Sequence, residues 1–136
     1  MANEYARNQR DASFATTKAL PAAAAAHNTN SFDLDQLTGG QIEGVEAEIV
    51  IPALTALVEA KTVTIKLQDS AEDTAFADVD PLVQTSVVGA VGNGCAAKTV
   101  RFRFPPGTRR YVALNIAVLT GGGDNTAKSI GFNLLF

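Results

Sequence analysis

Residues 62–68 read Thr-Val-Thr-Ile-Lys-Leu-Gln, and this stretch decides the fold. Its apolar side chains, Val63, Ile65 and Leu67, stand at every second position and alternate with polar ones. Successive side chains of a β-strand point to opposite faces of its sheet, so this alternation predicts a strand with one buried face. The stretch therefore favours a sheet that is packed on one side.

The same period of two recurs along the rest of the chain. It is found in residues 45–51, 99–104 and 129–136. Residues 111–119 are largely apolar on both faces, which predicts a central strand or one whose outer face meets a partner. The chain thus has several short strands and no long segment of helical periodicity.

Turn-forming sequences separate these strands. They are the polar residues 69–73, the Pro-Pro-Gly-Thr of residues 105–108 and the glycine-rich residues 121–125. Short strands with such turns predict an all-β fold, a jelly-roll-like β-sandwich of about eight short antiparallel strands. A helical turn is expected only in residues 36–43 or 53–60.

The N-terminal segment has a different composition. Residues 1–30 are rich in Ala, Asn and Thr, with little periodic hydrophobicity, and the alanines of residues 22–26 are too few for an isolated helix, which needs about 12–15 residues. The sequence predicts an extended N-terminal arm over residues 1–30, ordered only against a partner, and a β-sandwich domain over residues 31–136. Deletion of residues 2–30 is then expected to leave the sandwich folded and to abolish partner binding.

Charge is unevenly distributed along the chain. The formal net charge is -3, but residues 33–80 hold eleven acids and two bases, whereas residues 81–136 hold six bases and one acid. The two segments could pair within the fold or across a subunit contact, or they could be solvated faces. Net acidity argues against nucleic-acid binding. No apolar run approaches the ~20 residues of a membrane helix, so no membrane partner is expected.

The residue types that carry chemistry are scarce. His27 and Cys95 are the only histidine and cysteine, too few for the ligand set of a zinc site or for a nucleophile with an oriented base. The glycine-rich loops lack the lysine of a phosphate-binding loop. The acids in residues 69–80 do not follow the spacing of a calcium-binding loop. Two interpretations of this segment remain, a solvated loop and a calcium site. We expect no enzyme activity, no cofactor and no metal.

Three stretches, taken in order, resemble a known family. The first runs from Leu20-Pro21-Ala22-Ala23 to Phe32-Asp33-Leu34. The second, residues 51–76, contains Ile-Pro-Ala-Leu and then Thr-Val-Thr-Ile-Lys-Leu-Gln-Asp-Ser. The third, residues 105–114, is followed by a glycine-rich loop and a final strand. In this order they resemble the capsid cement (decoration) proteins of tailed bacteriophages.

The resemblance implies a jelly-roll-like fold and a structural role. Such subunits bind the major capsid protein on the outer surface of the phage head, where capsomers meet, and stabilise the expanded shell. They also self-associate, commonly as homodimers or homotrimers. The implied location is the outer capsid surface of the virion, and the host cytoplasm during assembly.

Seven residues are candidates for the partner interface. They are Phe14, Leu20, Pro21, Phe32, Arg109, Arg110 and Tyr111. The first four are the larger apolar groups of the expected arm, although Phe32 could instead begin the first core strand. The last three form a stretch that looks like one found in cement proteins.

Two other functions remain open at this point. A carbohydrate-binding or adhesion module could use the same scaffold, because a fold does not fix a function. The absence of tryptophan and the presence of only two tyrosines count against sugar stacking. The chain could also be another virion structural component, such as a tail part.

Overall fold

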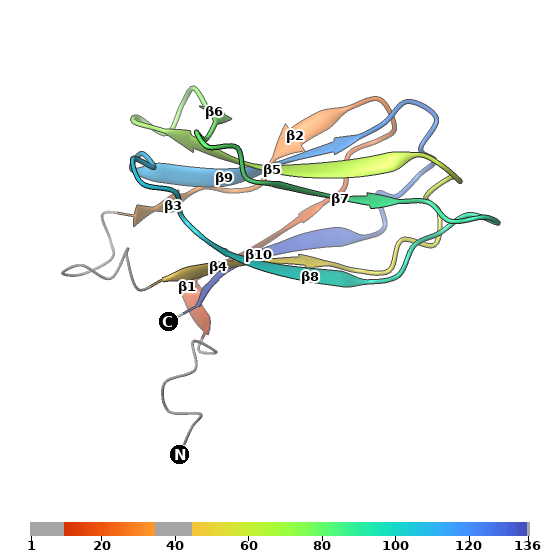
Figure 1. The fold of residues 1–136 in the computed structure, drawn as a ribbon, viewed down its shortest axis with the longest axis horizontal. Helices are drawn as coiled ribbons and strands as arrows, with labels where there is room; N and C mark the ends of the chain where they lie inside the picture. The colour runs from red at the N-terminus through yellow and green to blue at the C-terminus, as the bar shows by residue number, and fades with distance from the viewer. Residues whose placement is uncertain (1–9, 35–44, 136) are drawn as a thin grey trace, which may run out of the picture.

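The computed structural model describes residues 10–34 and 45–135, and these form two antiparallel β-sheets packed face to face (Figure 1). Ten strands lie within them: β1 (Arg10–Ala19), β2 (Ala26–Asn28), β3 (Phe32–Asp33), β4 (Glu46–Ile51), β5 (Thr62–Ser70), β6 (Ala77–Asp78), β7 (Gln84–Val88), β8 (Lys98–Arg103), β9 (Tyr111–Val118) and β10 (Ser129–Leu135). The predicted all-β class and the β-sandwich are confirmed.

The strand order explains why the prediction of about eight strands is close. One sheet has the order β1-β10-β4-β8, and the other has β2-β9-β5-β6, with β3 also beside β9 and β7 also beside β5. Both β2 and β3 pair with β9 and act as one interrupted strand. Both β6 and β7 pair with β5 in the same way. Each sheet therefore has four strand positions.

The pairings are nested along the chain. The first strand β1 pairs with the last strand β10, β2 and β3 pair with β9, β4 pairs with β8, and β5 pairs with β6 and β7. Every one of these ladders is antiparallel. The chain thus folds back on itself as one long hairpin whose successive strand pairs alternate between the two sheets.

Alternation along β5 places one face in the core, as predicted. Val63, Ile65 and Leu67 are fully buried between the sheets. The opposite sheet contributes Phe132, Ile49 and other apolar side chains. Burying a side chain of this size contributes about 1.5–3 kcal/mol, so the shared core is the main stabilising term of the fold.

The central position of β9 is also confirmed. The strand lies between β2/β3 and β5, and its core-facing Val112, Leu114 and Ile116 are fully buried. Ala113, on the opposite face, is only 1% exposed. The largely apolar sequence of residues 111–119 therefore reflects a strand with a neighbour on each side.

The prediction of a separate N-terminal arm is wrong for the residues that the structure describes. Residues 15–19 of β1 pair with β10, and β2 pairs with β9, so this segment supplies a strand to each sheet. The signal in β1 is weak because Thr16 and Lys18 occupy half-buried positions of an edge strand, where apolar residues would have shown the period of two. Residues 1–9 lie outside the described residues.

The expected helical turns differ as well. Residues 53–60 form turns and two isolated bridges, Leu54 with Cys95 and Glu59 with Gly89, instead of a helical turn. This segment crosses from one sheet to the other, and hydrogen bonds to neighbouring loops hold its backbone. Residues 36–43 lie outside the described residues.

Candidate functional site

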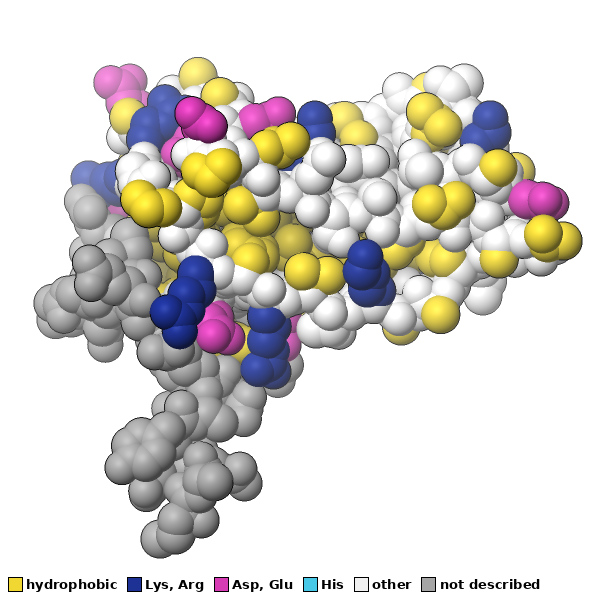
Figure 2. Space-filling model, in the orientation of Figure 1, with side chains coloured by type: hydrophobic (Ala, Val, Ile, Leu, Met, Phe, Trp, Pro, Cys, Tyr) yellow, Lys and Arg dark blue, Asp and Glu magenta, His cyan; other side chains and the backbone are white. Residues whose placement is uncertain are grey.

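The two ends of the sandwich differ in composition. We call the loops of residues 22–26, 53–60, 89–97 and 119–127 the alanine-rich end. The opposite end, formed by residues 69–80 and 105–110, is the charged end. Figure 2 shows Lys, Arg, Asp and Glu side chains gathered toward the charged end, whereas the far end is mostly hydrophobic and uncharged polar surface.

Large apolar side chains are exposed at or beside the alanine-rich end. Val91 is 88% exposed, Val88 52% and Leu119 48%. The exposed alanines of this end include Ala24, Ala25, Ala53, Ala56, Ala90, Ala96 and Ala97. Exposed apolar patches on soluble domains mark interaction sites, so this end is the candidate partner surface.

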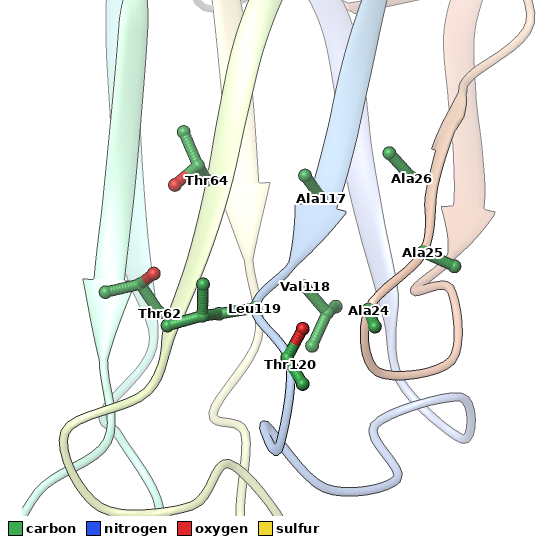
Figure 3. Close-up of a pocket in the computed structure, with 9 residues that line it drawn as sticks. All are labelled: Ala24, Ala25, Ala26, Thr62, Thr64, Ala117, Val118, Leu119 and Thr120. Atoms are coloured by element: carbon green, nitrogen blue, oxygen red, sulfur yellow. The ribbon is translucent and has the colours of Figure 1, made fainter.

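A shallow hollow lies beside this end, on the outer face of the β2-β9-β5 sheet (Figure 3). Its volume is about 300 Å³, and its lining residues are Ala24, Ala25, Ala26, Thr62, Thr64, Ala117, Val118, Leu119 and Thr120. The hollow exists because small residues stand side by side across three strands: Ala26 pairs with Ala117, which pairs with Thr64. Its lining carries methyl and hydroxyl groups and no acid or base, so it can seat an apolar or backbone surface.

The predicted interface residues Arg109 and Arg110 lie at the charged end and are held within the chain. Arg109 Nη2 lies 2.8 Å from Asp69 Oδ1. Arg110 donates from Nε and Nη2 to the two oxygens of Asp33, at 2.8 and 2.9 Å. The Arg110 guanidinium also lies 5.0 Å from the centre of the Tyr111 ring. These pairs tie the loop of residues 105–110 to both strands that flank β9.

The apolar interface candidates lie elsewhere. Phe14, Leu20 and Phe32 are 7%, 1% and 5% exposed and belong to the core, and Pro21 is buried. Phe14 meets Phe32 edge to face, with ring centres 6.0 Å apart. Their burial leaves almost no surface for a partner, so the assignment of these four to an interface is withdrawn, and Phe32 begins a core-facing strand. The seven candidates form no common surface.

The acidic and basic segments of the sequence pair with each other within the fold, which is the first of the alternatives that the uneven charge left open. Within the described part of the chain, four ion pairs join acids of residues 33–80 to bases of residues 81–136. They are Arg101–Glu48 at 3.6 Å, Arg103–Glu46 at 4.0 Å, Arg109–Asp69 at 2.8 Å and Arg110–Asp33 at 2.8 Å. The uneven charge along the sequence therefore becomes cross-strand and loop pairing in space.

Chemistry-bearing side chains are scattered in the described part of the chain. His27 Nε2 lies 2.6 Å from the Ala19 carbonyl oxygen, and Cys95 is half-buried beside Leu54. No group of three or more His, Cys, Asp or Glu is close enough to hold a metal ion among these residues. In residues 69–80, the carboxylates of Asp69 and Asp78 already accept hydrogen bonds from side chains of this chain. The calcium alternative gains no support.

One carboxyl group has a shifted pKa. Asp124 Oδ1 accepts hydrogen bonds from the Thr126 hydroxyl at 2.6 Å and the Thr126 amide at 3.1 Å. These bonds favour the ionised form and lower the pKa of Asp124 below its ordinary value of 3.8. These hydrogen bonds join Asp124 to Thr126 within the glycine-rich loop at the alanine-rich end.

The fold and the candidate surface define a small β-sandwich protein with an exposed apolar end. The Bbp16 family matches residues 14–131 of the sequence, so the chain belongs to the Bbp16 family. No curated protein matches it. Among solved structures, the crystal structure of PirA is similar over 96% of this chain and 97% of its own, with 11% identity and a TM-score of 0.45. At that distance the similarity gives no information on function.

No helix in the described residues is long and apolar enough to cross a membrane.

The alanine-rich end is the feature that sequence reasoning missed. Its alanines and valines stand in separate loops and strand ends, and each alone is ordinary in a soluble protein. The five-alanine run of residues 22–26 was the available signal. Its meaning depends on the fold, which brings it beside Leu119 and Thr62 (Figure 3).

Proposed function

We propose that this chain is a viral structural protein, a capsid cement (decoration) protein of a tailed bacteriophage. It binds the outer surface of the head at capsomer junctions and stabilises the shell after expansion. Its partners are the major capsid protein and further copies of itself, as a homodimer or homotrimer. It has no enzymatic activity, and it resides on the virion surface.

The observation that carries this proposal is the exposed apolar end on a well-packed sandwich. A decoration protein needs many copies of one passive contact, and it needs no catalytic centre. Val91, Val88 and Leu119 supply such a contact, because each keeps about half or more of its side chain in water when the chain is alone. Covering them removes apolar surface from water, which contributes roughly 25 cal/mol per Å². The order of the three family-like stretches supports the same role.

We also propose that the sandwich is a jelly roll. Support comes from the eight strand positions and from the nested pairing of β1 with β10, β2/β3 with β9 and β4 with β8. A jelly roll is a two-sheet fold of eight strands with this kind of return pairing. The glycan-binding alternative has less support, because the hollow beside the alanine-rich end has no aromatic lining residue.

The test is co-sedimentation of the purified chain with expanded, undecorated phage heads. Saturable binding that raises the resistance of the heads to heat or osmotic shock is expected. Val91→Glu is the informative variant, because a side chain that is 88% exposed can be changed without disturbing the core. A buried carboxylate at the contact should weaken binding strongly.

Ala77→Glu is the matched control, since Ala77 is exposed on β6 near the charged end. It adds the same charge away from the proposed contact and should bind like the parent chain. Failure of the parent chain to bind heads would refute the decoration role. Equal binding by the two variants would remove the alanine-rich end from the contact.

A further inference from the structure

The strand β8 is a sheet edge with a free side. It is the last strand of the β1-β10-β4-β8 sheet, and among the described residues it pairs with β4 alone. An unpaired edge presents a row of backbone N–H and C=O groups that can accept another strand. Figure 1 shows β8 and β7, an edge of the other sheet, on the same side of the sandwich.

Apolar side chains lie beside this edge, at the opening between the sheets. Phe102, Phe104 and Val83 are only partly buried and pack against the core. The rings of Phe102 and Phe104 meet edge to face, with centres 6.0 Å apart. Figure 2 shows hydrophobic side chains at the bottom of a hollow between the sheets on this side. An added strand could bury its own apolar side chains there.

The charge of β8 limits what can pair with it. The strand carries Lys98, Arg101 and Arg103 and no acid. Arg101 and Arg103 lie 3.6 and 4.0 Å from Glu48 and Glu46 of β4, on the side away from the free edge. A second copy of β8 in the antiparallel register centred on Phe102 would set Arg101 opposite Arg103, which is destabilising. The complementary strand is acidic.

We propose that the β8 edge binds an extended acidic segment of another protein by strand addition, with acidic and apolar side chains alternating along it. The backbone of the segment continues the sheet, which supplies affinity, and the alternate side chains supply specificity. Its carboxylates meet Arg101 and Arg103 on the outer face of the sheet, and its apolar side chains cover Phe102 and Phe104 on the inner face. This contact is separate from the alanine-rich end and does not depend on the decoration role.

The probe is a blocked, dye-labelled heptapeptide, Glu-Val-Glu-Thr-Glu-Val-Glu, with its Lys-Val-Lys-Thr-Lys-Val-Lys counterpart as the charge control. Fluorescence anisotropy with the full chain is expected to show saturable binding of the acidic peptide only. Amide hydrogen exchange read by NMR should show new protection at alternate residues of β8, because only every second residue points to the free side.

Arg103→Gln tests the charge at an exposed position of the edge. The Arg103 side chain is 63% exposed and its pair with Glu46 is long, at 4.0 Å, so its loss should leave the fold intact. The variant should bind the acidic peptide about tenfold more weakly. Lys128→Gln, the same charge change at the loop before β10, should bind like the parent chain. No binding of the acidic peptide, equal binding of both peptides or no protection in β8 would overturn the proposal.

Discussion

Arg109 encloses the carboxylate of Asp69 from two directions. Its Nε and Nη2 donate to Asp69 Oδ1 at 3.0 and 2.8 Å, and its backbone amide donates to Oδ2 at 2.9 Å. Nη2 also donates to the Asp69 carbonyl oxygen at 2.8 Å. The Asp69 side chain is 8% exposed and both of its carboxylate oxygens accept hydrogen bonds, so the end of β5 and the loop before β9 are joined at a buried carboxylate.

Asp69→Asn should destabilise the fold by about 2 kcal/mol. Both carboxylate oxygens accept from N–H donors, and an amide can offer an oxygen to one side only. Either orientation of the substituted amide therefore places an NH2 group against a donor of Arg109. Urea unfolding at pH 7 measures the change as a lower midpoint at constant slope.

Asp78→Asn is the matched control for the Asp69→Asn substitution. Asp78 pairs with Lys66 at 3.5 Å and is 41% exposed, so solvent screens the interaction. Its loss should cost below about 1 kcal/mol. Equal effects of the two substitutions would show that the buried geometry at Asp69 adds nothing.

A deletion of residues 2–30 should unfold the chain, contrary to the expectation from sequence. The deletion removes β1 and β2 and takes Phe14 and Leu20 out of the core. It also exposes the edges of β10 and β9. Circular dichroism with thermal melting should show no cooperative transition. A cooperative melt near that of the full chain would restore the arm interpretation.

The contrast between β5 and β1 shows how far the sequence could predict this fold. In β5, three apolar residues at every second position predict both a strand and the face that it buries. In β1, half-buried Thr16 and Lys18 stand where apolar residues would reveal the same period. The apolar period in a sequence therefore predicts strands that bury much apolar surface. It misses edge strands that are stabilised mainly by backbone pairing with a neighbouring strand.

Pairs of residues far apart in sequence set a second limit. The arginines of residues 109–110 were predicted to meet a partner, but they pair with Asp69 and Asp33, which lie 40 and 77 residues away in the same chain. Nothing local indicates that these bases are used within the chain. The alanine-rich end is likewise assembled from separate loops, so only the nested strand pairing brings its parts together.

Gly89→Ala should be strongly destabilising. A Cβ atom at this position would lie 2.1 Å from the Val58 carbonyl oxygen, so backbone must move. We expect a loss above about 3 kcal/mol, in the range of severe core overpacking. Gly107→Ala is the comparison, because its φ of +83° is strained for alanine but nothing lies within 4 Å of the added carbon. That strain costs about 1–2 kcal/mol. Calorimetry should give the lower Tm to Gly89→Ala, and the reverse order would contradict the close approach.

Thr29→Val should cost about 1–3 kcal/mol. Thr29 lies in the break between β2 and β3, is 6% exposed, and its hydroxyl accepts a hydrogen bond from the Leu114 amide at 3.0 Å. Valine keeps the shape and leaves that buried N–H without an acceptor. Thr29→Ser retains the oxygen and should lose less. Chemical denaturation of the two variants checks this order, and a valine variant as stable as the serine one would argue against it.

Titration of Asp124 followed by NMR should give a pKa below 3.8. Thr126→Val should raise the pKa of Asp124 toward 3.8, because the variant removes the hydroxyl that contributes most to the shift. The unfolded carboxyl keeps its ordinary pKa, so the folded chain binds fewer protons in this range. The stability that Asp124 contributes is therefore present above pH 3.8 and is lost as the pH falls through the lower folded value. The difference in Tm between parent and Thr126→Val should shrink over that acidic window. An unchanged pKa in the variant would show that the hydroxyl does not stabilise the carboxylate.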